Sequence, residues 1–484
     1  MSDKPNLGTL FDPKGVVVVG ASSHPGKFGF VALHNILDSG FEGPVYATNK
    51  ETISLLGITT VKELHEIPNG EVDFAMICVP SHAVPQTLIE AAKIGVKAAF
   101  IVSGGYSEMG KDGEKTEIEL LNLSKELGIA ISGPNGQGFV STPSRLCSQI
   151  VAPFPPEGKI AIASQSGNLL SSFMNLSRYY GIGISRGISI GNQTCLRASD
   201  YVNYFSDDPE TQVIVLYLEG IPDGRNLFQA IKHATKRKPV IVIRGGSSPE
   251  GAKAAASHTG SLASDYRIFR GMLNQAGAFL ADDPQTAYEW AASFATQPKP
   301  QGENTIILTT AGGWGVLTAD AVAQSSLELA DLEKDLTEQI DEILPPRWSR
   351  SNPIDIAGGE TRETIPQMID LILSHSSVDA LIFLGLGIQG NVARLYSESK
   401  YLDSGMERIM NFHSSQEQKY ADALIDGSEE WGKPVLVASE LAASDPNNAG
   451  IEALRDRKWL CHMSGSRAVA SLENLCAYAR HIET

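Results

Sequence analysis

The chain has 484 residues, of which 42% are hydrophobic and 20% are charged. That composition is ordinary for a globular protein, and the length predicts roughly three domains of about 150 residues each. The formal net charge of −17 argues against nucleic acid or an anionic membrane as the main partner.

The N-terminal sequence and the cysteine pattern predict the cellular location. No apolar run is long enough to cross a bilayer, and the first ten residues are polar, without a signal-peptide core. The five cysteines are far apart and show no CxxC spacing. We therefore expect a cytoplasmic protein with reduced thiols, without a disulfide framework and without a metal site.

Short β-branched runs that end in Gly, Pro or Ser alternate with helical stretches along the whole chain. The predicted strands are Val16–Val19, Ala75–Val79, Ala99–Val102, Lys159–Ala163, Val213–Leu218, Val240–Ile243, Thr305–Leu308, Ala380–Leu384 and Pro434–Val437. Apolar strands that alternate with helices indicate parallel sheets covered on both faces. Proline-containing polar stretches at Val151–Gly158 and Gln297–Asn304 are predicted linkers. The expected fold is α/β with three doubly wound domains, at residues 1–150, 151–298 and 299–484.

The stretch Val16–Gly29 contains a strand, a glycine-containing turn and the start of a helix. Gly20 permits a tight turn, the backbone N–H groups at the following helix start can bind phosphate, and Lys27 adds a cation. Ser22 stands where a dinucleotide fingerprint has its second glycine, and Tyr46–Lys50 offers no acidic residue for a ribose. A nicotinamide-dependent oxidoreductase is therefore the less favoured interpretation. The strand ends at Val79–Pro80 and Ser103–Gly105 are predicted to line the same crevice.

A second candidate site follows the strand Lys159–Ala163. Ser164, Ser166 and Gly167 stand at a predicted helix start, where hydroxyls, free N–H groups and the helix dipole favour an anion. An ordinary helix cap is the alternative interpretation of this turn.

The third candidate is His258, within the small-residue loop Ser257–Ala263. A neutral imidazole can attack a phosphoryl group, provided that an acceptor orients its other nitrogen. Glu219 closes the strand Val213–Leu218, and a carboxylate there is costly unless it has a partner or a function. We predict His258 and Glu219 as a catalytic pair; a structural histidine and a surface-turn glutamate are the alternatives.

The motifs together resemble the alpha subunits of ADP-forming acetyl-CoA synthetases and of succinyl-CoA synthetases. The matching stretches are GASSHPGKFG, CVP, VSGGYSEMG, GPNGQG, SQSG, YLEG, SHTGSLA, TTAGGWGVLTADA and NPIDIAGG, in that order. The resemblance covers nearly the whole chain. It implies a Rossmann-like CoA-binding domain followed by two flavodoxin-like CoA-ligase domains.

The resemblance also implies roles for the candidate residues. His258 would carry the phosphoryl group, Glu219 would hydrogen-bond it, and Ser164, Ser166 and Gly167 would hold the phosphate. CoA would be bound by residues of the first domain, namely Gly20, Ala21, Ser22, Ser23, Lys27, Gly29, Asn49, Lys50, Val79, Pro80, Ser103 and Gly104. The sequence departs from the family pattern at Tyr46–Lys50, which lacks prolines beside Asn49, and at Gly136, Cys195, Arg244 and Ser264.

The implied reaction interconverts acyl-CoA, ADP and phosphate with a small carboxylic acid, ATP and CoA, through an acyl phosphate and a phosphohistidine. The chain has no GxxxxGK[ST] motif and no stretch that reads as an ATP-grasp site. We therefore expect a beta subunit of the ATP-grasp type that binds ATP or ADP with Mg²⁺, in a heterotetramer. A catalytically inactive CoA-binding regulatory protein of the same fold is the alternative.

Overall fold

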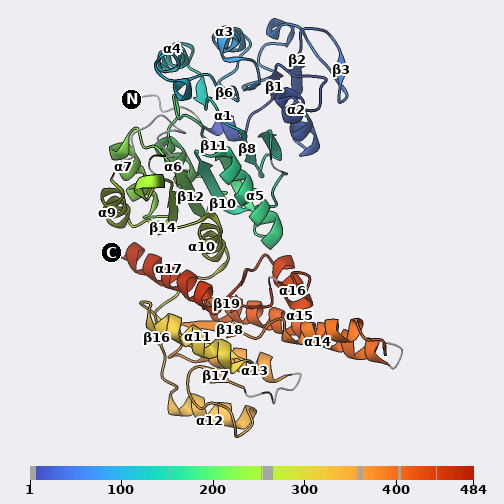
Figure 1. Ribbon diagram of the computed structural model, residues 1–484, viewed down its shortest axis with the longest axis vertical. Coiled ribbons are helices and arrows are strands. Elements are labelled where there is room, and N and C mark those ends of the chain that lie inside the picture. Colours follow the sequence, from blue (N-terminus) through green and yellow to red (C-terminus); the bar gives the residue numbers. More distant parts are fainter. Residues whose placement is uncertain are drawn as a thin grey trace. The chain divides into compact units, whose positions relative to one another are not determined.

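The computed structural model describes residues 7–151, 153–251, 253, 265–356, 358, 363–401, 405–442 and 444–483. One compact unit contains the described residues up to Tyr179 and those from Gly183 to Tyr288, and a second contains most of the remainder, from Glu289 onward. The described strands form three large sheets and one small hairpin (Figure 1). The sheets are mostly parallel and covered by helices, which confirms the predicted α/β class.

The first sheet has the strand order β2-β1-β5-β6-β7, and all its neighbours are parallel. Val16 and Val18 join a core with α2, whereas Val17 and Val19 pack with α3 and α4 on the other face. This alternation follows from the two-residue period of a strand. The elements are α1 (Gly8–Phe11), β1 (Val16–Val19), α2 (Phe28–Asp38), β2 (Val45–Thr48), the hairpin β3 (Ser54–Leu55) and β4 (Ile58–Thr59), η1 (Leu64–Glu66), β5 (Phe74–Ile77), η2 (Ser81–Ala83), α3 (Val84–Lys93), β6 (Ala98–Ile101), η3 (Ser107–Met109), α4 (Lys111–Leu127) and β7 (Ala130–Ser132).

The second sheet has the order β14-β13-β12-β10-β11-β8-β9, and its strands β10 to β14 are parallel. Its edge differs from the expected parallel pattern, because β8 and β9 form an antiparallel hairpin in which β8 pairs with β11. A short connection can only join antiparallel neighbours. The elements are β8 (Gly138–Ser141), β9 (Leu146–Gln149), β10 (Glu157–Ser164), α5 (Gly167–Tyr180), β11 (Ile184–Ser189), α6 (Ala198–Asp207), β12 (Val213–Leu218), α7 (Gly224–Ala234), β13 (Val240–Arg244), α9 (Tyr266–Ala276), β14 (Phe279–Ala281) and α10 (Pro284–Thr296).

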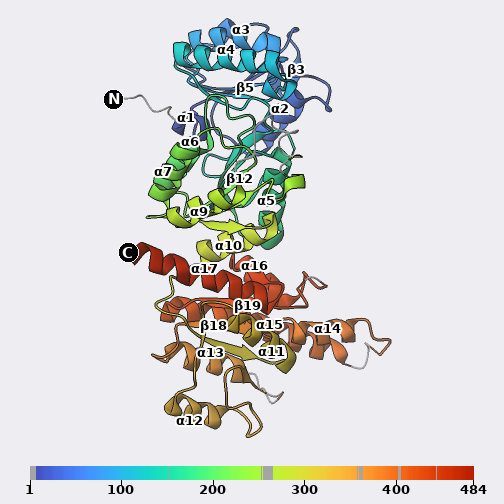
Figure 2. The ribbon, with the colours of Figure 1, turned by 60° about the vertical axis from the view of Figure 1, so that its left-hand side comes forward.

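The third sheet has the order β16-β15-β18-β19-β20, with β17 beside the end of β15. Ile307 and Ile382 pack against α11 and α17, whereas Ile306 and Phe383 face α13 and α15. Figure 2 shows α14 and α15 extending together beyond this sheet. The elements are β15 (Asn304–Thr309), α11 (Gly312–Ala323), β16 (Glu328–Leu329), α12 (Lys334–Ile343), β17 (Ile354–Asp355), α13 (Thr364–Ser374), β18 (Ala380–Leu384), α14 (Ile388–Ser397), α15 (Met406–Trp431), β19 (Val435–Ala438), α16 (Ala449–Asp456), β20 (Cys461–His462) and α17 (Gly465–Glu483).

The first two sheets share a hydrophobic core that contains an aromatic cluster. Phe139 of β8 lies with its ring centroid 5.6 Å from that of Phe11, 5.2 Å from that of Phe74 and 6.2 Å from that of Phe100. All four side chains are fully buried. The β8–β9 hairpin thus connects the second sheet to the core of the first.

A buried arginine reinforces this junction. Arg186 of β11 has a side chain only 4% exposed, and its Nη1 and Nη2 lie 2.6 and 2.9 Å from the two carboxylate oxygens of Asp12. Its Nε donates to Asp208 Oδ2 at 3.2 Å. Burial opposes the charge, but the two carboxylates hold the pKa of Arg186 above its ordinary value. The guanidinium therefore stays charged and links the segment before β1 to the second sheet.

All five cysteines are free thiols, and burial raises the pKa of Cys78 and of Cys147 to about 12. Among the helices of the described ranges, none combines the length and the apolar character that a bilayer crossing requires.

Replacing Arg186 with Ala should destabilise the first unit by about 3–5 kcal/mol, because Asp208 would be left as a buried charge without its partner. Arg145→Ala is the matched control, since its ion pair with Glu42 is exposed and is worth at most about 1 kcal/mol. Urea denaturation followed by circular dichroism measures both. Equal stabilities of the two variants would contradict the role given to Arg186.

Candidate functional site

The predicted crevice of the first domain exists as a cleft of about 720 Å³ at the carboxyl ends of β1, β2 and β5. Six of the predicted CoA-binding residues line it, namely Gly20, Ala21, Asn49, Lys50, Val79 and Pro80. Asn49 Nδ2 donates to the Ala21 carbonyl at 2.8 Å, so this side chain holds the turn after β1 in place. Lys50 is exposed at the rim, where its cation can meet a phosphate.

Two glycines in this turn are required by close contacts. Gly20 has a φ of +84°, and a Cβ at this position would lie 2.9 Å from Val79 Cγ1. A Cβ at Gly29 would lie 2.2 Å from the Gly20 carbonyl oxygen. The start of α2 therefore packs directly on the turn, as a helix N-terminus must in order to present its N–H groups to a phosphate. Ser22, Ser23 and Lys27 lie between these glycines, and the last two are exposed.

A second cleft, of about 530 Å³, lies within the same unit between the loop after β6 and the carboxyl ends of β10, β11 and β12. Gly104 lines it from the first domain, and Ser166 and Gly167 line it from the second. Gly220, the residue after Glu219, lines it as well. The predicted Ser103–Gly105 loop and the predicted anion site thus contribute residues to one cavity. Ser103 lies next to it, and its hydroxyl is buried without a hydrogen-bond partner.

The predicted anion site is built at the junction of β10 and α5. Ser164 ends the strand, is fully buried, and donates its hydroxyl to the Ser166 carbonyl at 2.7 Å. Ser166 Oγ accepts from the Leu169 N–H at 3.4 Å, in the way of a helix cap. A Cβ at Gly167 would lie 2.2 Å from Gln137 Cδ, so a larger residue at this position would displace that side chain.

Glu219 is 8% exposed and stands directly after β12. Tyr217 Oη donates to its Oε1 at 3.0 Å, and burial first and then this carboxylate raise the pKa of Tyr217. The backbone around Glu219 is fixed by Gln165, whose Oε1 accepts from the N–H groups of Glu219 and Gly220 at 2.5 and 3.0 Å. Arg244 Nη1 donates to the carbonyl oxygens of Leu218 and Glu219, although burial lowers its pKa.

His258 lies outside the described residues, in the segment 254–264. The predicted hydrogen bond between Glu219 and His258 therefore remains a prediction. The strand that precedes the loop, β13, pairs with β12 so that Arg244 is in register with Leu218. The chain thus enters the segment before His258 beside Glu219, at the same edge of the sheet.

Sequence reasoning missed several polar residues that form the second cleft. Asn192 Nδ2 donates to Glu108 Oε2 and to Glu117 Oε1, both at 2.7 Å, and thereby ties the loop after β11 to the loop after β6. Burial opposes the charge of Glu108, but the Asn192 amide and the N–H groups of Gly105 and Tyr106 hold its pKa below the ordinary value. Gln137 Nε2 donates to Asn168 Oδ1 at 3.0 Å, and its Oε1 is buried without a partner. The only available signal was the position of Asn192 directly after a strand and a glycine.

Comparisons with known proteins match three successive parts of the chain to known domain types. A CoA-binding domain model matches residues 14–141, a model of the succinyl-CoA ligase like flavodoxin domain matches residues 157–294, and a ligase-CoA domain model matches residues 305–388. The matched class is a CoA-binding ligase of α/β architecture, with the domain types predicted from the motifs.

The relatives are more specific. The chain is 37% identical to subunit alpha of acetate–CoA ligase [ADP-forming] I from Pyrococcus furiosus, over 98% of both chains. It is 35% identical to acetate–CoA ligase [ADP-forming] I from Archaeoglobus fulgidus, of which it covers 54%. The structure of a dinucleotide-forming acetyl-coenzyme A synthetase 1 from Ca. Korarchaeum cryptofilum, in complex with phosphate and ADP, matches with a TM-score of 0.86 and 32% identity, over 99% of this chain and 98% of the other. The chain belongs to the family of ADP-forming acyl-CoA synthetase alpha subunits, as predicted.

Gly20→Val should weaken CoA binding by at least about tenfold, because the branched side chain would displace the turn at a cost of about 1–3 kcal/mol. Gly57→Val is the matched control. Gly57 has a φ of +86°, but a Cβ at this position would have no atom within 4 Å, so Gly57 shares the backbone strain without the contact. Calorimetric titration of the full chain with CoA compares them. Equal losses in both variants would remove the turn from the CoA site.

Proposed function

We propose that this chain is the CoA-binding, phosphohistidine-carrying subunit of an ADP-forming acid–CoA ligase that acts on a small carboxylic acid. The observation that carries the proposal is the shared cleft, in which Gly104 of the CoA domain faces Ser166, Gly167 and Gly220 of the ligase domain. A thioester held by the first group would stand beside an anion site and beside the strand end that bears Glu219.

CoA is assigned to the two clefts of the first unit. The nucleotide end fits the cleft of Gly20, Asn49, Lys50 and Pro80, where backbone N–H groups and a lysine favour phosphate. The thiol end would reach the second cleft past Ser103 and Gly104. A Cβ at Gly105 would lie 2.9 Å from Ser81 Oγ, so the loops that border the two clefts are in direct contact.

The proposed reaction has three balanced steps. Inorganic phosphate attacks the thioester carbonyl, which forms an acyl phosphate and releases CoA as the thiolate. An imidazole nitrogen of His258 then attacks the phosphorus, the P–O bond to the acyl group breaks, and the carboxylate leaves. Finally, a terminal oxygen of ADP attacks the phosphohistidine, which gives ATP and restores the imidazole.

The residues of this chain would serve these steps by position and charge. The start of α5, with Ser164, Ser166 and Gly167, would hold the phosphate, and its N–H groups would stabilise the negative charge that develops on the transferred group. Glu219 would accept the N–H of the other imidazole nitrogen and stabilise the positive charge on phosphorylated His258. Tyr217 donates to the carboxylate of Glu219, and Gln165 fixes the backbone of Glu219.

The proposal extends to the domain bounds, the partner subunit and the location. We assign the domains to residues 1–150, 151–298 and 299–484; each contains most of one sheet, although the β8–β9 hairpin precedes the first boundary and pairs with the second sheet. A beta subunit of the ATP-grasp type would bind the nucleotide with Mg²⁺ in a heterotetramer, which accords with the alpha-subunit names of the relatives. The location would be cytoplasmic.

Phosphorylation of His258 tests the proposal. The chain together with its beta partner, labelled ATP and Mg²⁺ should give an acid-labile, base-stable label, whereas the chain alone should not. His258→Ala should abolish the label, and His233→Ala, at an exposed site on α7, should retain it. A label of equal yield in His258→Ala would refute the mechanism, and absence of label with intact CoA binding would favour a regulatory protein.

Glu219→Gln should lower the phosphohistidine yield by roughly ten- to a hundredfold, since one charged hydrogen bond is worth about 1.5–3 kcal/mol. The substitution keeps the shape and the contact with Tyr217 but removes the charge. Glu210→Gln, which changes a half-exposed carboxylate paired with Lys159, is the control and should leave the yield unchanged. Phosphohistidine lifetime and yield of the two variants are compared, and equal values would exclude Glu219.

A further inference from the structure

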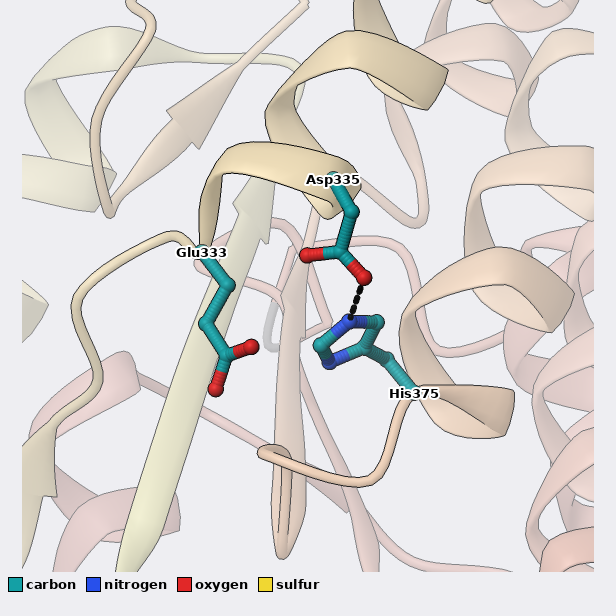
Figure 3. Close-up of side chains that lie close together, drawn as sticks. All are labelled: Glu333, Asp335 and His375. Carbon is teal, nitrogen blue, oxygen red and sulfur yellow. Dashed lines mark hydrogen bonds and ion pairs between the residues drawn. The ribbon is translucent and has the colours of Figure 1, made fainter.

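Three side chains with metal-ligating atoms converge in the second unit, within α12, α13 and their ends. They are Glu333, Asp335 and His375, and we call them the α12–α13 cluster (Figure 3). One ligand atom from each residue lies within 4.8 Å of the other two. Neither the motifs nor the proposed reaction uses these residues.

The fold brings the cluster together from two helix ends. Glu333 caps the start of α12 with an extended backbone, and Asp335 follows in the first turn. His375 caps the end of α13 and lies 40 residues further along the chain than Asp335. Because α12 and α13 pack against each other, the three side chains point into one space.

The spacing of the two nearest ligand atoms suits a small divalent ion. His375 Nε2 lies 3.3 Å from Asp335 Oδ2. Tetrahedral coordination with metal–ligand distances of about 2.0–2.1 Å places neighbouring ligand atoms about 3.3 Å apart. The side chain of Asp335 is 66% exposed and that of His375 only 11%, so a fixed imidazole faces a carboxylate that can adjust. Glu333 is also exposed and can rotate inward.

The imidazole has an orienting contact on its other nitrogen. The Ser377 N–H donates to His375 Nδ1 at 3.3 Å, which places the imidazole proton on Nε2, facing Asp335 Oδ2. On metal binding this proton would move to Nδ1, where Ser377 Oγ at 2.7 Å can accept it in a hydrogen bond, and the lone pair of Nε2 would face the ion. Ligating histidines in proteins are commonly held in this way by a hydrogen bond to the second nitrogen.

The surrounding charges favour a cation. Two neighbouring lysines are directed elsewhere: Lys433 donates to the His375 carbonyl at 2.7 Å, and Lys334 pairs with Glu338 at 3.5 Å. The two carboxylates together would neutralise a divalent ion.

We propose that the α12–α13 cluster is a binding site for a divalent transition-metal ion of the Zn²⁺ class, which Co²⁺ and Ni²⁺ can replace. One imidazole nitrogen and two carboxylate oxygens suit these ions, whereas Mg²⁺ prefers oxygen ligands alone in octahedral geometry. The bound ion joins the start of α12 to the end of α13. Binding to the folded state alone then stabilises the second unit by mass action.

Titration of the tag-free full chain with Co²⁺, followed by its visible absorption, tests the site directly. The parent should show a saturable spectrum of nitrogen and oxygen coordination that Zn²⁺ displaces and Mg²⁺ does not. Glu333→Gln, Asp335→Asn and His375→Gln should each weaken binding at least about tenfold, and Ser377→Ala by about ten- to a hundredfold if it orients the ring. His233→Gln is the control and should bind as the parent does.

Two results would overturn the proposal. One is that Glu333→Gln and His375→Gln bind Co²⁺ as tightly as the parent does, because the metal would then bind elsewhere. The other is failure of the parent to bind below millimolar Co²⁺, which would leave the cluster as an ion pair between His375 and Asp335. Glu333 and Asp335 are exposed, so their variants should fold, and thermal melting monitored by circular dichroism verifies folding of these variants and of His375→Gln.

Discussion

The first unit depends on a buried charge that belongs to two sheets at once. Arg186 stands on a strand of the second sheet and is neutralised by Asp12, which precedes the first strand of the first sheet, and by Asp208. A buried ion is tolerated only when its partners stay in place, so this contact fixes where the chain enters the first sheet. The second cleft lies between these two sheets, so it depends on that restraint and on the aromatic cluster around Phe139, which fix the sheets relative to each other.

Within this frame, parallel strands direct the functional residues to one place. Each strand of a parallel sheet ends at the same edge, so turns that are distant in sequence become neighbours in space. This explains why local sequence patterns found so much of the candidate site. An apolar run followed by a glycine, proline or serine marks both the strand and the turn, as at Gly20, Pro80 and Ser164, and topology then brings turns of different strands together. The strands β12 and β18 agree with their predicted bounds for the same reason.

The remaining residues depend on contacts that no local pattern encodes. Gln137 and Gln165 lie within the GPNGQG and SQSG motifs, which gave them no role, and Asn192 is an ordinary polar loop residue in sequence. All three acquire their roles only from the complementary group on a second loop. The same holds for Arg186, whose partners are as much as 174 residues away. The α12–α13 cluster also requires the register of two helices to be known. For the histidine loop the situation is reversed, because its motif is the most specific in the sequence while the loop lies outside the described residues.

The β8–β9 hairpin also limits where this chain can be cut into fragments that fold. Every residue of its two strands is buried, and although the hairpin precedes the proline-rich joint near residue 151, it pairs with β11 beyond that joint. A fragment that ended near residue 151 would contain the β8–β9 hairpin, which forms the edge of the second sheet, but not the rest of that sheet. In the C-terminal fragment, β11 would become an exposed sheet edge. In the N-terminal fragment, the hairpin would lack its pairing strand, and both changes favour aggregation. Recombination that exchanges CoA-binding modules would therefore have to cross over before Gly138, or carry both sheets together.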